Sequence, residues 1–123
     1  MTFGKSMNAH TGNQSWVVDR GGQVIQKKAQ SGVTSLNDWE RLVYCLWVAD
    51  YGMRNAGDLE TAKDIYADFQ SIAQQAAKKL SLPLTHESFS MAQHTLEEKY
   101  FDRFDAICNE IKSAEPRELR GRD

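Results

Sequence analysis

The sequence has few of the features that indicate catalysis, metal binding or redox chemistry. Its two cysteines, Cys45 and Cys108, lie in apolar stretches without CxxC spacing or a neighbouring histidine. We therefore expect reduced thiols that pack as small apolar side chains in a cytoplasmic protein. His86 and His94 are eight positions apart, too far for the i, i+4 pair of a helical metal site. No glycine-rich phosphate loop or nucleophile elbow is present, so we expect no metal and no cofactor.

An excess of charge of one sign and a long apolar run are also lacking. The 15 Lys and Arg residues nearly balance the 17 Asp and Glu residues, and the formal net charge is −2. Because binding to a phosphate backbone requires a basic surface, we expect no nucleic-acid partner. The longest apolar run falls far short of the roughly 18 residues that span a bilayer, so we expect no membrane partner. With 123 residues, of which 41% are hydrophobic, the chain should form one domain.

The most apolar stretch lies near the middle of the chain, and we interpret it as the central element. Residues from Leu42 to Ala49 are apolar without interruption. A surface helix shows an apolar stripe beside a polar face, whereas a continuous apolar run is typical of a buried helix. A strand is the alternative, because the run is rich in β-branched and aromatic residues. The length of the stretch favours a helix over about 36–55.

Both ends of this helix carry recognisable signals. A start of capping-box type is available from Ser35 with Asp38 or from Asn37 with Glu40. At the other end, Gly57 suits a left-handed C-cap, because glycine adopts a positive φ without steric cost. These signals support a buried central helix.

Two further helices are predicted after this one. Apolar residues recur with a helical period from Leu59 to Leu80, and Asp58 can cap the start, which predicts a helix over 58–80. Pro83 interrupts this period. A second stripe predicts a third helix over 86–112, so we expect a core of three helices.

A short β-hairpin is predicted over 15–28, ahead of the helices. Gly21 and Gly22 can supply the positive φ angles of a two-residue turn, which places Val18 opposite Ile25. Trp16 would lie on the same side as these two residues. The alternative is an irregular segment that Trp16 alone anchors to the core.

The segments at both ends of the chain lack apolar periodicity. Residues 1–14 are small and polar, and we expect a mobile arm. Residues 113–123 are rich in arginine and are expected to be disordered. The predicted fold is therefore mostly α, with one domain over 15–112 that combines the hairpin with the three-helix core.

A polar group near the end of the central helix is the candidate ligand-binding site. Asp50 continues an apolar row, where a carboxylate needs a partner, and Arg54 lies four residues on along the same face. Together with Tyr51 and Asn55 they could bind a polar ligand. An arginine beside the carboxylate favours its ionised form, which suits binding better than general-base catalysis, and we assign no catalytic residue. The alternative is that these residues only cap one helix and begin the next.

Acidic side chains on the predicted second and third helices are the candidate partner-binding residues. The second helix carries Asp64 and Asp68, and the third carries Asp102 and Asp105. Most acidic helix faces are simply solvated, and a minority dock a basic partner. We therefore weigh these four residues as a docking face against the simpler interpretation of a solvated surface.

The segment from Tyr51 to Leu59, YGMRNAGDL, lies at the end of the aromatic-rich central helix. It resembles the helix-end motif of a bacterial family of small, mostly helical proteins that includes a DNA-mimic protein. That motif has the form acidic-Val-Asn-Asn-Gly-Gly-aromatic, of which Asn55 and Gly57 match directly. The resemblance implies a binding protein without catalytic residues.

Taken together, the sequence predicts a non-enzymatic bacterial cytoplasmic binding protein of immunity, antitoxin or regulatory type. It would present an acidic helical face to a protein partner. The alternative is a small polar-ligand-binding or enzymatic domain with its site at Asp50 to Asn55. A binding protein needs a broad exposed face, whereas an enzyme needs a cleft at that corner. A third interpretation is that the hairpin and the aromatic rows form a homodimer.

Overall fold

The computed structural model describes residues 2–116, and it describes side chains from residue 12 onward. The regular structure within that range consists of helices and contains no strand. In chain order the elements are α1 (Thr2–Ser31), the 3₁₀ turn η1 (Val33–Ser35), α2 (Asp38–Ala56), α3 (Glu60–Ile65), α4 (Phe69–Lys79), α5 (Pro83–Phe89) and α6 (Gln93–Ser113). The prediction of an α-helical core is confirmed, whereas the predicted three-helix core with a hairpin is wrong.

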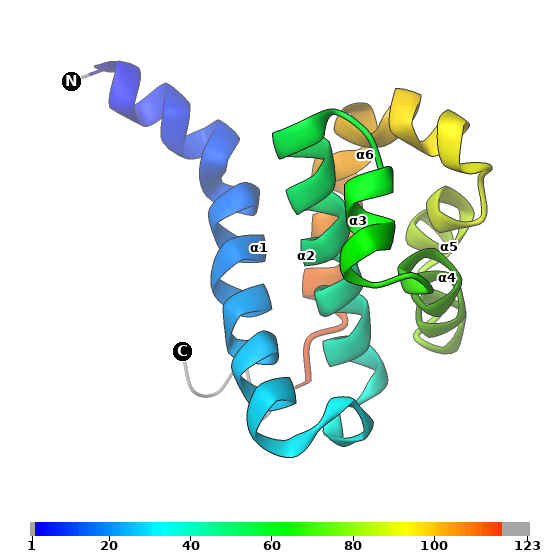
Figure 1. Ribbon diagram of the computed structural model, residues 1–123. Helices are drawn as coiled ribbons and strands as arrows, with labels where there is room; N and C mark the ends of the chain where they lie inside the picture. The colour runs from blue at the N-terminus through cyan, green and yellow to red at the C-terminus, as the bar shows by residue number, and fades with distance from the viewer. Residues whose placement is uncertain (1, 117–123) are drawn as a thin grey trace.

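The long helices α1, α2 and α6 lie alongside one another, with α2 between α1 and the pair α4 and α5 (Figure 1). α2 runs antiparallel to α1, because Lys27 near the end of α1 bonds Glu40 near the start of α2. α6 also runs antiparallel to α2, since the Trp39 indole donates to the Ile111 carbonyl at 2.8 Å. In the described residues, no helix is both long and apolar enough to cross a bilayer.

The predicted hairpin over 15–28 is wrong, because this whole segment belongs to α1. Val17 and Val24 are buried, whereas Val18 is 52% exposed. Positions seven residues apart share one face of a helix, and the hairpin register would instead have placed Val18 on the inner side. Residues 2–14, predicted as an arm, form the first part of the same helix.

The glycine pair that suggested a turn allows close packing of two helices instead. A Cβ atom on Gly21 would lie 2.4 Å from Cδ1 of the Trp47 side chain, so only glycine lets α1 approach α2 this closely. A Cβ atom on Gly22 would meet nothing within 4 Å. The requirement for glycine at position 21 therefore comes from α2, which the local sequence could not reveal.

The central helix α2 is confirmed together with both of its end signals. The Asn37 side chain accepts a hydrogen bond from the Glu40 backbone N–H at 2.8 Å, and the Glu40 carboxylate accepts one from the Asn37 backbone N–H at 2.9 Å. Together they form a complete capping box. Gly57 closes the helix in the left-handed conformation with φ 76°. Asn37 with Glu40, rather than Ser35 with Asp38, is thus the true start signal.

The predicted helix over 58–80 is divided into α3 and α4, and the predicted helix over 86–112 is divided into α5 and α6. At the first break, between α3 and α4, Tyr66 has an extended backbone. The centre of its ring lies 5.1 Å from the centre of the Tyr44 ring of α2. At the second break the Gln70 side chain donates to the Met91 carbonyl at 2.6 Å. Side chains from distant elements therefore stabilise helix ends that a helical period alone does not show.

Two glutamates of α6 stabilise the starts of the short helices. Glu97 accepts from the Leu59 amide at 2.8 Å, just before α3. Glu110 accepts from the Thr85 amide at 2.7 Å and from the Leu84 amide at 3.0 Å, in the first turn of α5. These carboxylates satisfy amides that have no partner within their own helices. α6 thus fixes where α3 and α5 begin.

The predicted disordered tail over 113–123 lies only partly within the described residues. Ser113 ends α6, and Glu115 is buried beside Arg20 of α1, with their charged atoms 2.9 Å apart. Residues 117–123 fall outside the described residues.

Candidate functional site

The predicted ion pair between Asp50 and Arg54 forms at the C-terminal end of α2. The Asp50 side chain is buried, with 4% of the residue exposed. The Arg54 Nε–H is shared between the two carboxylate oxygens of Asp50, at 3.0 Å from each. The Tyr100 hydroxyl of α6 donates to the same carboxylate at 2.7 Å. A buried carboxylate of this kind is stable only when its charge is matched and its oxygens accept hydrogen bonds.

Tyr100 was not predicted as part of this site, although it lies in the apolar stripe of α6. Burial, followed by the nearby Asp50 charge and the hydrogen bond to it, raises the pKa of Tyr100 well above its usual value. The hydroxyl therefore stays protonated and acts as a permanent hydrogen-bond donor. Its partner lies 50 positions away in the chain, so no local pattern could have paired them.

Arg54 connects the buried Asp50 and Tyr100 side chains with the molecular surface. Its guanidinium carbon lies 4.8 Å from the centre of the Phe104 ring and 5.1 Å from that of the Phe101 ring. These are cation–π distances, and they hold the guanidinium in one place. The Arg54 side chain is nevertheless 26% exposed. An arginine that is fixed on one side and open to solvent on the other can contact a binding partner.

All four predicted ligand-binding residues line one shallow depression of about 210 Å³ between α1 and α2. The Trp47 and Tyr51 rings stack there with their centres 5.6 Å apart, and the Asn55 amide donates to the Tyr51 carbonyl at 2.8 Å. Gln14 and Val18 contribute from α1, where we had predicted an arm and a strand. The complete lining is Gln14, Val18, Trp47, Asp50, Tyr51, Arg54 and Asn55.

Three large apolar side chains are exposed around Arg54. Val18 and Tyr51 line the depression together with Arg54 and are 52% and 44% exposed. Phe101, which packs against the other side of the guanidinium, is 49% exposed. We name Val18, Tyr51, Arg54 and Phe101 the Arg54 surface. It combines residues of α1, α2 and α6, which are far apart in sequence.

The four predicted partner-binding acids do not form one face. Asp64 belongs to α3 and Asp68 lies just before α4, whereas Asp102 and Asp105 belong to α6. In Figure 1, α3 lies in front of α2 and α6 lies behind it. Asp105 lies one helical turn from Phe101 of the Arg54 surface. It also accepts from the Asn13 side-chain amide of α1 at 2.8 Å.

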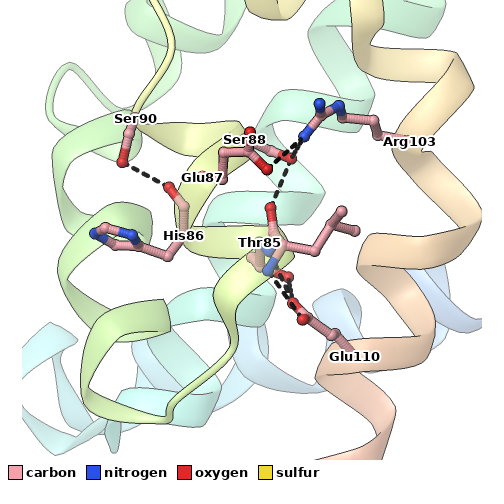
Figure 2. Close-up of polar contacts among 8 residues, drawn as sticks. Thr85, His86, Glu87, Ser88, Ser90, Arg103 and Glu110 are labelled. Atoms are coloured by element: carbon pink, nitrogen blue, oxygen red, sulfur yellow. Dashed lines mark hydrogen bonds and ion pairs between the residues drawn. The ribbon is translucent and has the colours of Figure 1, made fainter.

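A second polar cluster, between α5 and α6, has a structural role (Figure 2). The Thr85 hydroxyl donates to Glu110 at 2.7 Å, and Arg103 contacts Glu87 at 3.3 Å and the Ser88 hydroxyl at 3.2 Å. The His86 ring points away from these groups, so it cannot activate either hydroxyl (Figure 2). These contacts fasten α5 to α6 and do not assemble a nucleophile with its base.

Neither metal-ligating groups nor reactive thiols add chemistry to the site. Across the described residues, no three His, Cys, Asp or Glu side chains are grouped closely enough to hold a metal ion. Cys45 and Cys108 are both buried and unpaired, and burial raises the pKa of each thiol to about 12. Both therefore remain neutral thiols near neutral pH.

No family model, curated protein or solved structure matches the chain. The resemblance carried by Asn55 and Gly57 therefore stays a prediction.

Proposed function

We propose that this protein is a non-enzymatic binding protein, of immunity, antitoxin or regulatory type, which docks a protein partner through the Arg54 surface. The observation that supports this most strongly is the gathering of three exposed apolar side chains around one fixed arginine. Tyrosine, tryptophan and arginine are the residues that most often dominate the binding energy of protein interfaces. Tyr51, Trp47 and Arg54 all lie at this depression.

The side chains of the Arg54 surface are held in place before any partner arrives. Arg54 is fixed by the Asp50 carboxylate and two phenyl rings, and Tyr51 is stacked on Trp47. Side chains that are already ordered lose less conformational entropy on association. The buried network under the surface therefore supports binding rather than proton transfer.

The four predicted partner-binding acids do not all belong to the proposed interface. Asp105 lies one turn after Phe101 on α6 and belongs to the edge of the proposed interface, whereas Asp102 is next to Phe101 in sequence and faces another side of the helix. Asp64 in α3 and Asp68 just before α4 are left out of it. The binding energy would come from the apolar residues, while the acids would contribute to selectivity and to the rate of association.

A small polar ligand at the same depression is the second candidate function. Its support is that Asp50, Tyr51, Arg54 and Asn55 all line one hollow. The volume of about 210 Å³ is smaller than the roughly 300 Å³ at which ligand pockets usually begin. Both oxygens of Asp50 also accept bonds from Arg54, and one accepts a further bond from Tyr100. We therefore rank the protein partner first.

Capture from a lysate of the native cells, with four single-site variants, tests the proposal. Val18→Ala and Tyr51→Ala should lose a stoichiometric protein partner that the parent chain retains. Val33→Ala and Ile65→Ala are matched controls, because both residues are exposed and apolar but lie away from the Arg54 surface. They should retain the partner. Equal capture by all four variants would reject the surface, and a retained small molecule that depends on Arg54 would favour the second candidate.

A further inference from the structure

We infer that the partner presents an apolar side chain flanked by lysine or arginine to the Arg54 surface. This inference rests on the proposed function and adds the chemical class of the partner. It follows from two independent properties of the surface, which are the shape of its centre and the charge of its edge.

The centre of the surface accommodates one apolar group. Val18 and Tyr51 border the depression of about 210 Å³, and Arg54 separates it from the exposed Phe101 ring. An exposed apolar group of this kind gains free energy when a partner side chain removes it from water. The small volume suits a single side chain better than a drug-sized molecule.

The edge of the surface is acidic on both sides. Glu98 and Asp105 lie one turn before and one turn after Phe101 on α6, and all three side chains are exposed. On α1, the exposed Asp19 follows Val18 and lines a neighbouring depression with it. Three carboxylates thus surround the apolar centre.

Two cations near the surface, Arg54 and Lys112, already contact other groups of the protein. Arg54 is paired with the buried Asp50, so the two charges offset each other. Lys112 donates to the Asn13 side chain at 2.5 Å, and its ammonium lies 5.3 Å from the centre of the Trp16 ring. Glu98 also lies 3.6 Å from the His94 ring. We take the three exposed carboxylates at the edge to favour a basic partner over an acidic one.

The same charge pattern disfavours a symmetric homodimer through this surface. A two-fold contact brings the same patch of each copy together. It would place the acidic edge of one copy, with Asp19, Glu98 and Asp105, close to the acidic edge of the other. Like charges at an interface are costly, so a second copy is a poorer occupant than a basic segment of another protein.

Selection of random peptides on the full-length protein tests the class of partner. The probe is a phage-displayed peptide library, selected on the parent chain after depletion on the Tyr51→Ala variant. The enriched peptides should carry an apolar residue next to lysine or arginine. Synthetic copies should bind the parent chain, and replacing their basic residues by glutamate should weaken binding about tenfold or more.

Charge variants of the protein supply the matched comparison. The combined change Asp19→Asn, Glu98→Gln and Asp105→Asn should weaken the enriched peptides and reduce the salt dependence of binding. The combined change Asp64→Asn and Asp68→Asn, at exposed acids away from the surface, should leave binding unchanged. Melting temperatures of both variants should stay close to that of the parent chain, because these side chains are exposed.

The outcomes separate this inference from the proposed function. Enrichment of acidic or uncharged peptides, equal binding by the Asp19, Glu98 and Asp105 variant, or no Tyr51-dependent peptide at all would overturn the inference. If capture of a native partner still depends on Tyr51 in that case, the proposed function stands and only the class of partner falls. A concentration-dependent dimer that Tyr51→Ala abolishes would replace the basic partner by a second copy.

Discussion

Arg54 and Asp50 are four residues apart on α2, and the Arg54 Nε–H lies 3.0 Å from both oxygens of the Asp50 carboxylate. This pair joins the core to the surface, because Asp50 is buried and Arg54 is partly open to solvent. The Asp50–Arg54 pair therefore contributes both to the stability of the fold and to the proposed binding of a partner. Denaturation and binding measurements on variants can separate these two contributions.

Removal of the buried carboxylate should be costly. Asp50→Ala leaves Arg54 without its counter-ion and Tyr100 without its acceptor, and we expect a loss of about 3 kcal/mol in the free energy of unfolding. The value is at the lower end for a broken buried pair, because Arg54 can still reach water. Urea denaturation measures it. Asp102→Ala, at an exposed acid of α6, is the control and should cost less than about 0.5 kcal/mol. Equal small losses for both variants would show that the pair contributes little.

Tyr100 should make the protein sensitive to alkaline pH. Its folded-state pKa is raised by burial and by Asp50, so the stability that it contributes is fully present below the unfolded-state value of about 10. That stability is lost as the pH rises further, because the unfolded chain then releases the proton and the folded chain does not. Tyr100→Phe should lower stability by about 1 kcal/mol at neutral pH and should flatten the alkaline decline. Urea midpoints of the parent chain and of Tyr100→Phe, measured from about pH 8 to 11, would show how steeply the stability of each falls with pH. Equal declines for the two proteins would contradict the prediction.

The two adjacent glycines of α1 should respond in opposite directions to alanine. Gly21→Ala places a methyl group against the Trp47 ring and should cost about 1 to 3 kcal/mol by overpacking. Gly22→Ala meets open space and should stabilise the helix by about 0.5 to 1 kcal/mol. Thermal melts of the two variants decide this. In a hairpin turn both positions would need glycine, so destabilisation of both would favour the turn over the helix.

The cysteines should be unreactive in the native protein. Because burial raises the pKa of Cys45 and of Cys108 to about 12, almost no thiolate is present at neutral pH. Alkylation by iodoacetamide, followed by mass spectrometry, should be slow in buffer and fast in denaturant. A native rate equal to that of a free cysteine would mean that these residues open to solvent readily.

Local patterns in the sequence predicted the part of the fold that depends on neighbouring residues. The continuous apolar run predicted α2. The capping pair Asn37 and Glu40 predicted its start, and Gly57 predicted its end. The Asp50–Arg54 pair was predictable for the same reason, because four residues along a helix bring two side chains together.

What the sequence did not show depends on residues that are distant in the chain. Gly21 was interpreted as part of a turn because its true partner, Trp47, lies in another helix. Tyr100 was assigned only to an apolar stripe, although its hydroxyl completes the Asp50 site. The breaks that separate α3 from α4 and α5 from α6 were missed, because Tyr66 packs on Tyr44 of α2 at the first and Gln70 of α4 bonds the Met91 carbonyl at the second. The apolar period of a helix shows which of its faces is buried, but it does not show which residues of other elements contact that face.

The two caps that α6 supplies have a consequence for the order in which the protein matures. While the ribosome has not yet released α6, the starts of α3 and α5 lack the Glu97 and Glu110 carboxylates. Phe101 and the Tyr100 hydroxyl are absent at that stage too, so the Arg54 surface is incomplete. We therefore expect nascent chains that stop before Gln93 to be readily cleaved by protease and unable to bind. Docking of α6 would thus complete both the fold of the preceding helices and the Arg54 surface, so a partner would bind only molecules in which α6 has docked.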